Sequence, residues 1–126
     1  MVINTAGVTL AHGMEHPASG LKNIVHGQGL AALTPVIIEA SYKGNREKFS
    51  KIARIMGGMT AEDCATKIRT LLKKLDLDCT LSDLGIKEED IPWMAENCMK
   101  VSAAGVMNNP VVFLKEEIAE IYRKAL

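Results

Sequence analysis

All three histidines of the chain lie within one short stretch, at His12, His16 and His26. His12 and His16 are four positions apart, so on a helix their rings lie on one face, about one turn apart. Pro17 is expected to end that helix, and the loop that follows can fold back to bring His26 beside the first two rings. Neutral imidazole is the commonest metal ligand, and two histidines at this spacing plus a third from another element form a usual site. The spacing alone therefore leaves two interpretations equally open: a metal site, or unrelated histidines at helix ends and in a loop.

The residues between the histidines exclude one familiar metal motif. The stretch HGMEH does not match the metalloprotease pattern HExxH, because Gly13 follows His12 and Glu15 directly precedes His16. A glutamate beside a ligand can orient that ligand through a hydrogen bond. An ordinary solvated side chain is nevertheless the preferred interpretation of Glu15. Four glycines, at positions 13, 20, 27 and 29, would let the backbone approach a bound cofactor.

The elements that must position these histidines are helices, because apolar residues recur at three- and four-residue intervals. The spacing predicts a first helix from about residue 2 to Pro17, a loop over 17–25, and a helix over about 27–42 that contains Pro35. Further helices are predicted over 49–56, from a capping box at 60–63 onward, over 91–98 and around 118–122. Residues 102–110 are expected to form a loop. We predict one all-α, bundle-like domain of six or seven helices over residues 1–126, with a core formed by Leu30, Leu33, Ile37, Phe49, Ile52, Ile68, Leu71, Leu72, Ile91, Ile118 and Ile121.

Composition limits the possible partners. The chain has 126 residues, and 15 acidic residues balance 15 basic ones, so nothing attracts it to nucleic acid or to an anionic membrane. No apolar run approaches the roughly 20 residues that span a bilayer. The three cysteines form no CxxC pair, which fits buried thiols in the reducing cytoplasm. The apolar start MVINTAG has no polar lead-in, which indicates either a frayed first turn or a longer protein that has been cut.

The histidine stretch resembles a known family. LAHGMEHPASGLKNIVHGQGLAALTP is similar to the metal-binding segment of the iron-containing (group III) alcohol dehydrogenases, and the closing stretch with DIP, NNP and IY resembles the end of the same family. The chain departs from the pattern at Ala18, where Leu is frequent, and at Lys115, where a Thr or Ser cap might stand. The residues that match the histidine motif are His12, Met14, His16, Pro17, His26, Gly27, Gly29, Leu30, Ala31 and Pro35.

The resemblance implies a fold and a set of roles. The fold would be the C-terminal half of the dehydroquinate synthase-like, iron-containing alcohol dehydrogenase fold. His12 and His26 would bind Fe²⁺, with Zn²⁺ as an alternative, and His16 would lie near the nicotinamide and the substrate, in proton relay or positioning. The cofactor would be NAD or NADP, and the substrate a small alcohol or aldehyde.

The resemblance also implies missing parts. In the family, another Asp and His ligand and a dinucleotide-binding domain lie upstream, whereas this chain has no fourth histidine. We therefore expect a fragment that is inactive alone. Its surface around residues 1–10, His12 and His16 is expected to be exposed and apolar, which favours self-association into a homo-oligomer.

Two other functions remain open at this point. One is a stand-alone helical metal-binding or scaffold module without oxidoreductase chemistry. The other is a small hydrolase with a three-histidine zinc site. For His16 alone, packing against the cofactor or capping its own helix is the simpler alternative to proton transfer.

Overall fold

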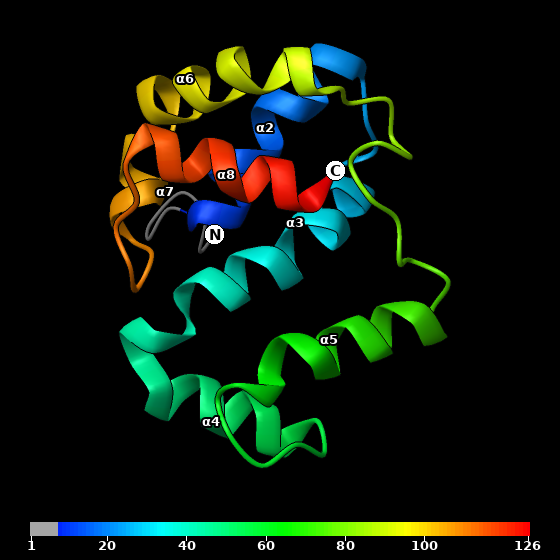
Figure 1. Ribbon diagram of the computed structural model, residues 1–126, viewed down its shortest axis with the longest axis vertical. Coiled ribbons are helices and arrows are strands. Elements are labelled where there is room, and N and C mark those ends of the chain that lie inside the picture. The colour runs from blue at the N-terminus through cyan, green and yellow to red at the C-terminus, as the bar shows by residue number, and fades with distance from the viewer. Residues whose placement is uncertain (1–7) are drawn as a thin grey trace.

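The computed structural model describes residues 8–126, and the regular secondary structure of this part of the chain is entirely helical (Figure 1). It has seven α-helices, two 3-10 helices and no β-strand, which confirms the predicted all-α class. The predicted helical residues 2–7 lie outside the described residues. The elements are α2 (Leu10–Lys22), α3 (His26–Ser41), η1 (Tyr42–Asn45), α4 (Arg46–Ile55), α5 (Asp63–Lys74), η2 (Glu88–Asp90), α6 (Ile91–Val101), α7 (Ala103–Met107) and α8 (Lys115–Ala125).

The main core lies between five of these helices. Helix α2 packs against α3, α6 and α7, and α8 packs against α3 and α6. In Figure 1, α6, α2 and α8 form the upper body of the molecule, and α3 leads away from it. The apolar stripes that predicted the helices point into this core, where burial of a large side chain is worth about 1.5–3 kcal/mol. Its fully buried large side chains include Leu10, Met14, Leu33, Leu81, Ile91, Met94, Ile118 and Tyr122.

A second, smaller core holds α4 and α5 against the end of α3. It consists of Ile38, Ala53, Cys64 and Ala65, with Phe49, Ile52 and Ile68 half-buried around them. Figure 1 shows α4 and α5 as a separate layer below the upper body. A pocket of about 330 Å³ opens between the two layers, lined by residues of α3, α5, the segment 78–80 and α8.

The predicted end of the first helix at Pro17 is wrong. Helix α2 continues through Pro17 to Lys22 and ends at Asn23, which adopts the left-handed conformation with φ 54°. Proline removes one hydrogen bond from a helix, but Pro17 is itself buried and α2 has neighbours on several sides. Packing of this kind, rather than helix propensity, provides most of the stability of a helix in a protein. The predicted loop over 17–25 is reduced to residues 23–25.

Some of the other sequence predictions are confirmed by the structure, and others are wrong. Pro35 lies within α3 without interrupting it, and residues 103–107 form α7 where a loop was predicted. Of the predicted core, Leu33, Ile37, Ile91, Ile118 and Ile121 are buried. Leu71 is 45% exposed, and Leu30, Phe49, Ile52, Ile68 and Leu72 are half-buried.

One N-terminal prediction is corrected, and a second is corrected at a single residue. Helix α2 begins at Leu10, because Thr9 is extended and Val8 is not helical. Leu10 is fully buried, so it does not contribute to the exposed apolar surface that was expected for residues 1–10. No helix among residues 8–126 is long and apolar enough to cross a membrane.

Candidate metal centre

The three histidines converge at the place where α2 and α3 meet. His12 and His16 lie one turn apart on α2, as their spacing predicts. His26 is the first residue of α3, and the short connection over residues 23–25 turns the chain so that α3 starts beside α2. The hydroxyl of Ser19 stabilises this turn by donating to the carbonyl of Ile24 at 2.9 Å.

The distances between the rings are those of a shared site. The ring centroids lie 5.0 Å apart for His12 and His26, 5.5 Å for His16 and His26, and 5.9 Å for His12 and His16. One nitrogen of each ring lies within 4.8 Å of one nitrogen of each of the other two. Nδ1 of His12 is 3.2 Å from Nε2 of His26. Two nitrogens bound to one zinc ion at about 2.0–2.1 Å in tetrahedral geometry would lie about 3.4 Å apart. The predicted approach of His12 and His26 is therefore confirmed.

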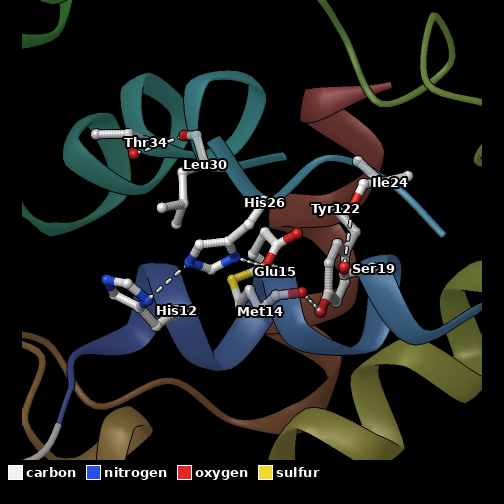
Figure 2. Close-up of polar contacts among 9 residues, drawn as sticks. All are labelled: His12, Met14, Glu15, Ser19, Ile24, His26, Leu30, Thr34 and Tyr122. Atoms are coloured by element: carbon white, nitrogen blue, oxygen red, sulfur yellow. Dashed lines mark hydrogen bonds and ion pairs between the residues drawn. The ribbon is translucent and has the colours of Figure 1, made fainter. Parts of the chain in front are cut away.

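The interpretation of Glu15 as an ordinary solvated side chain is wrong. Its side chain is fully buried, not solvated, and Oε2 pairs with Nδ1 of His26. Figure 2 shows the His26 ring between the two groups, with one nitrogen towards Glu15 and the other towards His12. An ionised carboxylate only accepts hydrogen bonds, so in a pair with ionised Glu15 the donor is Nδ1 of His26.

Gly29 makes the buried position of Glu15 possible. A Cβ atom on Gly29 would lie 2.6 Å from Cγ and 2.8 Å from Oε1 of Glu15, closer than real contacts allow. Gly29 lies one turn after His26 on α3, so both residues face α2. By contrast, a Cβ on Gly27 would meet nothing within 4 Å. Of these two glycines of the first turn of α3, only Gly29 provides space for the carboxylate.

The surroundings of His12 favour its uncharged form. Partial burial, followed by the neighbouring rings of His26 and His16, lowers the pKa of His12 below its ordinary value, although Glu15 acts in the opposite direction. Neutral imidazole is the form that binds metal ions. His12 thus favours the form in which one ring nitrogen keeps its lone pair.

The donor set fits a divalent transition-metal ion. Imidazole nitrogen suits Fe²⁺ and Zn²⁺, and three such donors are within reach of one another. Oε1 of the fully buried Glu15 has no hydrogen-bond partner among the described residues. An unpaired buried carboxylate oxygen is costly unless positive charge lies nearby, and a cation beside His26 would supply that charge.

Sequence reasoning identified the histidines but not the group beneath them. The signal for Glu15 was its position three residues after His12, which puts it on the same side of α2. A second signal was a glycine one turn after His26, where a carboxylate from the opposite helix could fit. Neither signal is specific without knowledge of how α2 and α3 cross.

The sequence of the chain is similar to those of known alcohol dehydrogenases and related enzymes. Residues 1–126 match the family model described as "Fe-containing alcohol dehydrogenase family, C-terminal". The 1,3-propanediol dehydrogenase of Klebsiella pneumoniae is 36% identical over 133 aligned residues, which cover 99% of this chain and 34% of that protein. The lactaldehyde reductase of Escherichia coli K12 is 31% identical, with coverage of 99% and 34%.

Solved structures agree with these relatives. The crystal structure of an archaeal halo-thermophilic alcohol dehydrogenase from a Red Sea brine pool matches with a TM-score of 0.88 and 37% identity, over 98% of this chain and 34% of that one. The fold is therefore that of the C-terminal, all-helical part of a metal-dependent dehydrogenase. The chain belongs to the Fe-containing alcohol dehydrogenase family, and it spans about a third of the length of the relatives that it matches.

Proposed function

We propose that this chain is the helical, metal-binding domain of an NAD(P)-dependent, iron-type alcohol dehydrogenase that interconverts a small alcohol and its aldehyde or ketone. On this proposal residues 1–126 form one domain, and the dinucleotide-binding domain and the remaining metal ligands come from a longer protein. The chain alone is then catalytically incomplete. The observation that supports the proposal best is the convergence of three imidazoles over a buried carboxylate in a chain of this family.

Each histidine has a proposed role. His12 and His26 hold the ion, which is Fe²⁺ in the first place and Zn²⁺ as an alternative, through neutral imidazole nitrogens. When bound, such an ion supplies Lewis-acid polarisation of the substrate oxygen. His16 is exposed and lies beside both other rings, which suits a residue that contacts the nicotinamide and the substrate and passes the hydroxyl proton to water.

The proposal also covers the cellular location of the enzyme and its oligomeric state. We place the enzyme in the reducing cytoplasm, because Cys64, Cys79 and Cys98 are all free thiols. We further propose that it is a homo-oligomer. Light scattering at rising concentration tests the assembly, and a strictly monomeric complete protein would contradict it.

Metal binding by the chain itself tests the proposal. Calorimetric titration with Zn²⁺, and with Fe²⁺ under anaerobic reducing conditions, is expected to show weak binding, because two protein ligands leave most of the coordination sphere to water. His12→Ala and His26→Ala are each expected to remove most of that binding. Binding that is unaffected by both substitutions would contradict the proposed site.

A matched control separates the histidine site from adventitious binding by a thiol. Cys79 is half-buried and its Sγ lies 3.5 Å from the carbonyl oxygen of Gln28, near the start of α3. Cys79→Ser removes this soft ligand without touching a histidine and is expected to leave the titration unchanged. The upstream coding sequence tests the remainder, because the proposal requires an Asp-x-x-x-His helix and a glycine-rich nucleotide loop there.

A further inference from the structure

We propose that Glu15 is a positioning residue of the metal centre: its buried carboxylate holds His26 in the Nδ1-protonated tautomer and aims Nε2 at the ion, in a space that Gly29 leaves open. This role rests on the proposed function, since His26 is there a ligand. It goes beyond that function by assigning roles to two residues that bind neither metal nor substrate.

The geometry of the His26 ring is the first argument. Nδ1 pairs with Oε2 of Glu15, and Nε2, at the opposite side of the ring, lies 3.2 Å from Nδ1 of His12. A ring with both nitrogens engaged in this way has one fixed orientation. Histidine ligands commonly donate their second N–H to a carboxylate, which selects the tautomer and increases the basicity of the ligand.

The burial of Glu15 is the second argument. Its side chain is fully buried, whereas that of His26 is 44% exposed. A buried ion pair is often no more stable than apolar residues of the same volume. Stability alone therefore does not explain a carboxylate here, and the unpartnered Oε1 adds to its cost. A role in orienting His26 and in balancing the charge of a bound cation accounts for both observations.

The packing around Glu15 is the third argument. Gly29 allows the carboxylate to lie under α3, because any side chain at that position would overlap Cγ and Oε1. On the other side, the buried hydroxyl of Tyr122 donates to the carbonyl of Met14, the residue next to Glu15 (Figure 2). The backbone of α2 is thus fixed where Glu15 leaves it.

The test measures the His26 tautomer in the metal-free chain. Two-bond ¹H–¹⁵N correlation spectra at about pH 8, where neutral imidazole predominates, distinguish protonation at Nδ1 from protonation at Nε2. The wild type is expected to show His26 protonated at Nδ1. Glu15→Met has similar volume but no acceptor, and it is expected to shift His26 to protonation at Nε2. Glu15→Gln keeps a carbonyl acceptor and is expected to retain the Nδ1 form.

Gly29→Ala and Gly27→Ala form a matched pair of variants, which tests whether the space at Gly29 accommodates the carboxylate of Glu15. Gly29→Ala is expected to displace the carboxylate and to reproduce the tautomer shift of Glu15→Met. Gly27→Ala lies in the same turn of α3 but meets nothing within 4 Å, and is expected to behave as wild type. Circular dichroism of each variant verifies that the helices are retained. If Gly29→Ala fails to fold, Glu15→Met still decides the tautomer.

Zn²⁺ titration of the same variants provides the second readout. Loss of a residue that orients a ligand typically lowers metal affinity by about 10- to 100-fold, and we expect this loss for Glu15→Met and a smaller one for Glu15→Gln. An unchanged His26 tautomer in folded Glu15→Met would overturn the positioning role. Zn²⁺ binding by the wild type that does not depend on His12 would instead overturn the proposed function, so the two failures are distinguishable.

Discussion

The hydroxyl of Tyr122 on α8 donates a buried hydrogen bond of 2.5 Å to the carbonyl oxygen of Met14 on α2, across 108 positions of the chain. Both side chains are fully buried, so the bond joins the last helix to the helix that carries two of the three histidines. A typical intramolecular hydrogen bond contributes about 0.5–1.5 kcal/mol to stability.

Removing that hydroxyl is expected to destabilise the fold. Tyr122→Phe should lower the free energy of unfolding by about 0.5–1.5 kcal/mol, because the variant loses one buried hydrogen bond. Urea unfolding followed by circular dichroism measures the change. Tyr42→Phe is the control, since Tyr42 is only half-buried and lies under the guanidinium of Arg46. Equal stability losses in the two variants would refute the assigned role of the buried bond.

His16 is expected to matter less for metal affinity than His12 does. If His16 serves the substrate and the cofactor, His16→Ala should retain most of the Zn²⁺ affinity that His12→Ala removes. The measurement is competition with a chromophoric chelator, and circular dichroism controls for the helix content of α2. A loss in His16→Ala as large as that in His12→Ala would identify a three-histidine site, which the nitrogen distances also permit. That result would favour the stand-alone metal-binding module.

Gly44 is expected to be intolerant of any side chain. It lies in η1, and a Cβ there would be 2.6 Å from the carbonyl oxygen of Pro110, which belongs to the backbone and cannot rotate away. Gly44→Ala should cost about 1–3 kcal/mol, in line with overpacked sites. Gly20→Ala on α2 meets nothing within 4 Å, and should be neutral or stabilising by up to about 1 kcal/mol. Thermal unfolding compares the pair, and similar midpoints would contradict the contact.

The three thiols are expected to react in a defined order. Burial raises the pKa of Cys98 to about 11, so at pH 8 only about one molecule in a thousand carries the thiolate that reacts. Cys64 is also fully buried, while Cys79 is half-buried. Iodoacetamide should therefore modify Cys79 first and Cys98 last, as followed by mass spectrometry of peptides. In urea the order should disappear, and preferential early labelling of Cys98 in the native protein would refute it.

The spacing of side chains predicted the helices better than it predicted their limits. The histidine face of α2 and the buried stripes of α6 and α8 depend on local periodicity, which the sequence contains. The passage of α2 through Pro17 depends on neighbours that bury it from several sides, and these come from distant segments. Leu71 is exposed for the same reason: α5 packs against α3 and α4, and this packing leaves part of its apolar stripe uncovered.

At the site too, some contacts follow from spacing within one helix, and others depend on how two helices pack against each other. His12 and His16 are neighbours through helix geometry alone, so their pairing was predictable. The burial of Glu15 depends on the crossing of α2 and α3 and on a missing side chain at Gly29. A glutamate is exposed in most contexts, so the general rule favoured solvent for Glu15, which the fold buries completely and pairs with His26.

The division of the interior into two cores has a consequence for how the molecule opens. The smaller core has four buried residues, and α3 contributes to both cores. Separating α4 and α5 exposes far less apolar surface than unfolding the whole chain, and such units open at a fraction of the global free energy. Backbone amides of α4 and α5 should therefore exchange with deuterium earlier than those of α6 and α8, while the histidine centre stays assembled. Uniform exchange across all four helices would show a single cooperative unit. If the order holds, the pocket between the two layers has one wall that remains fixed with the metal centre and another that can detach from it.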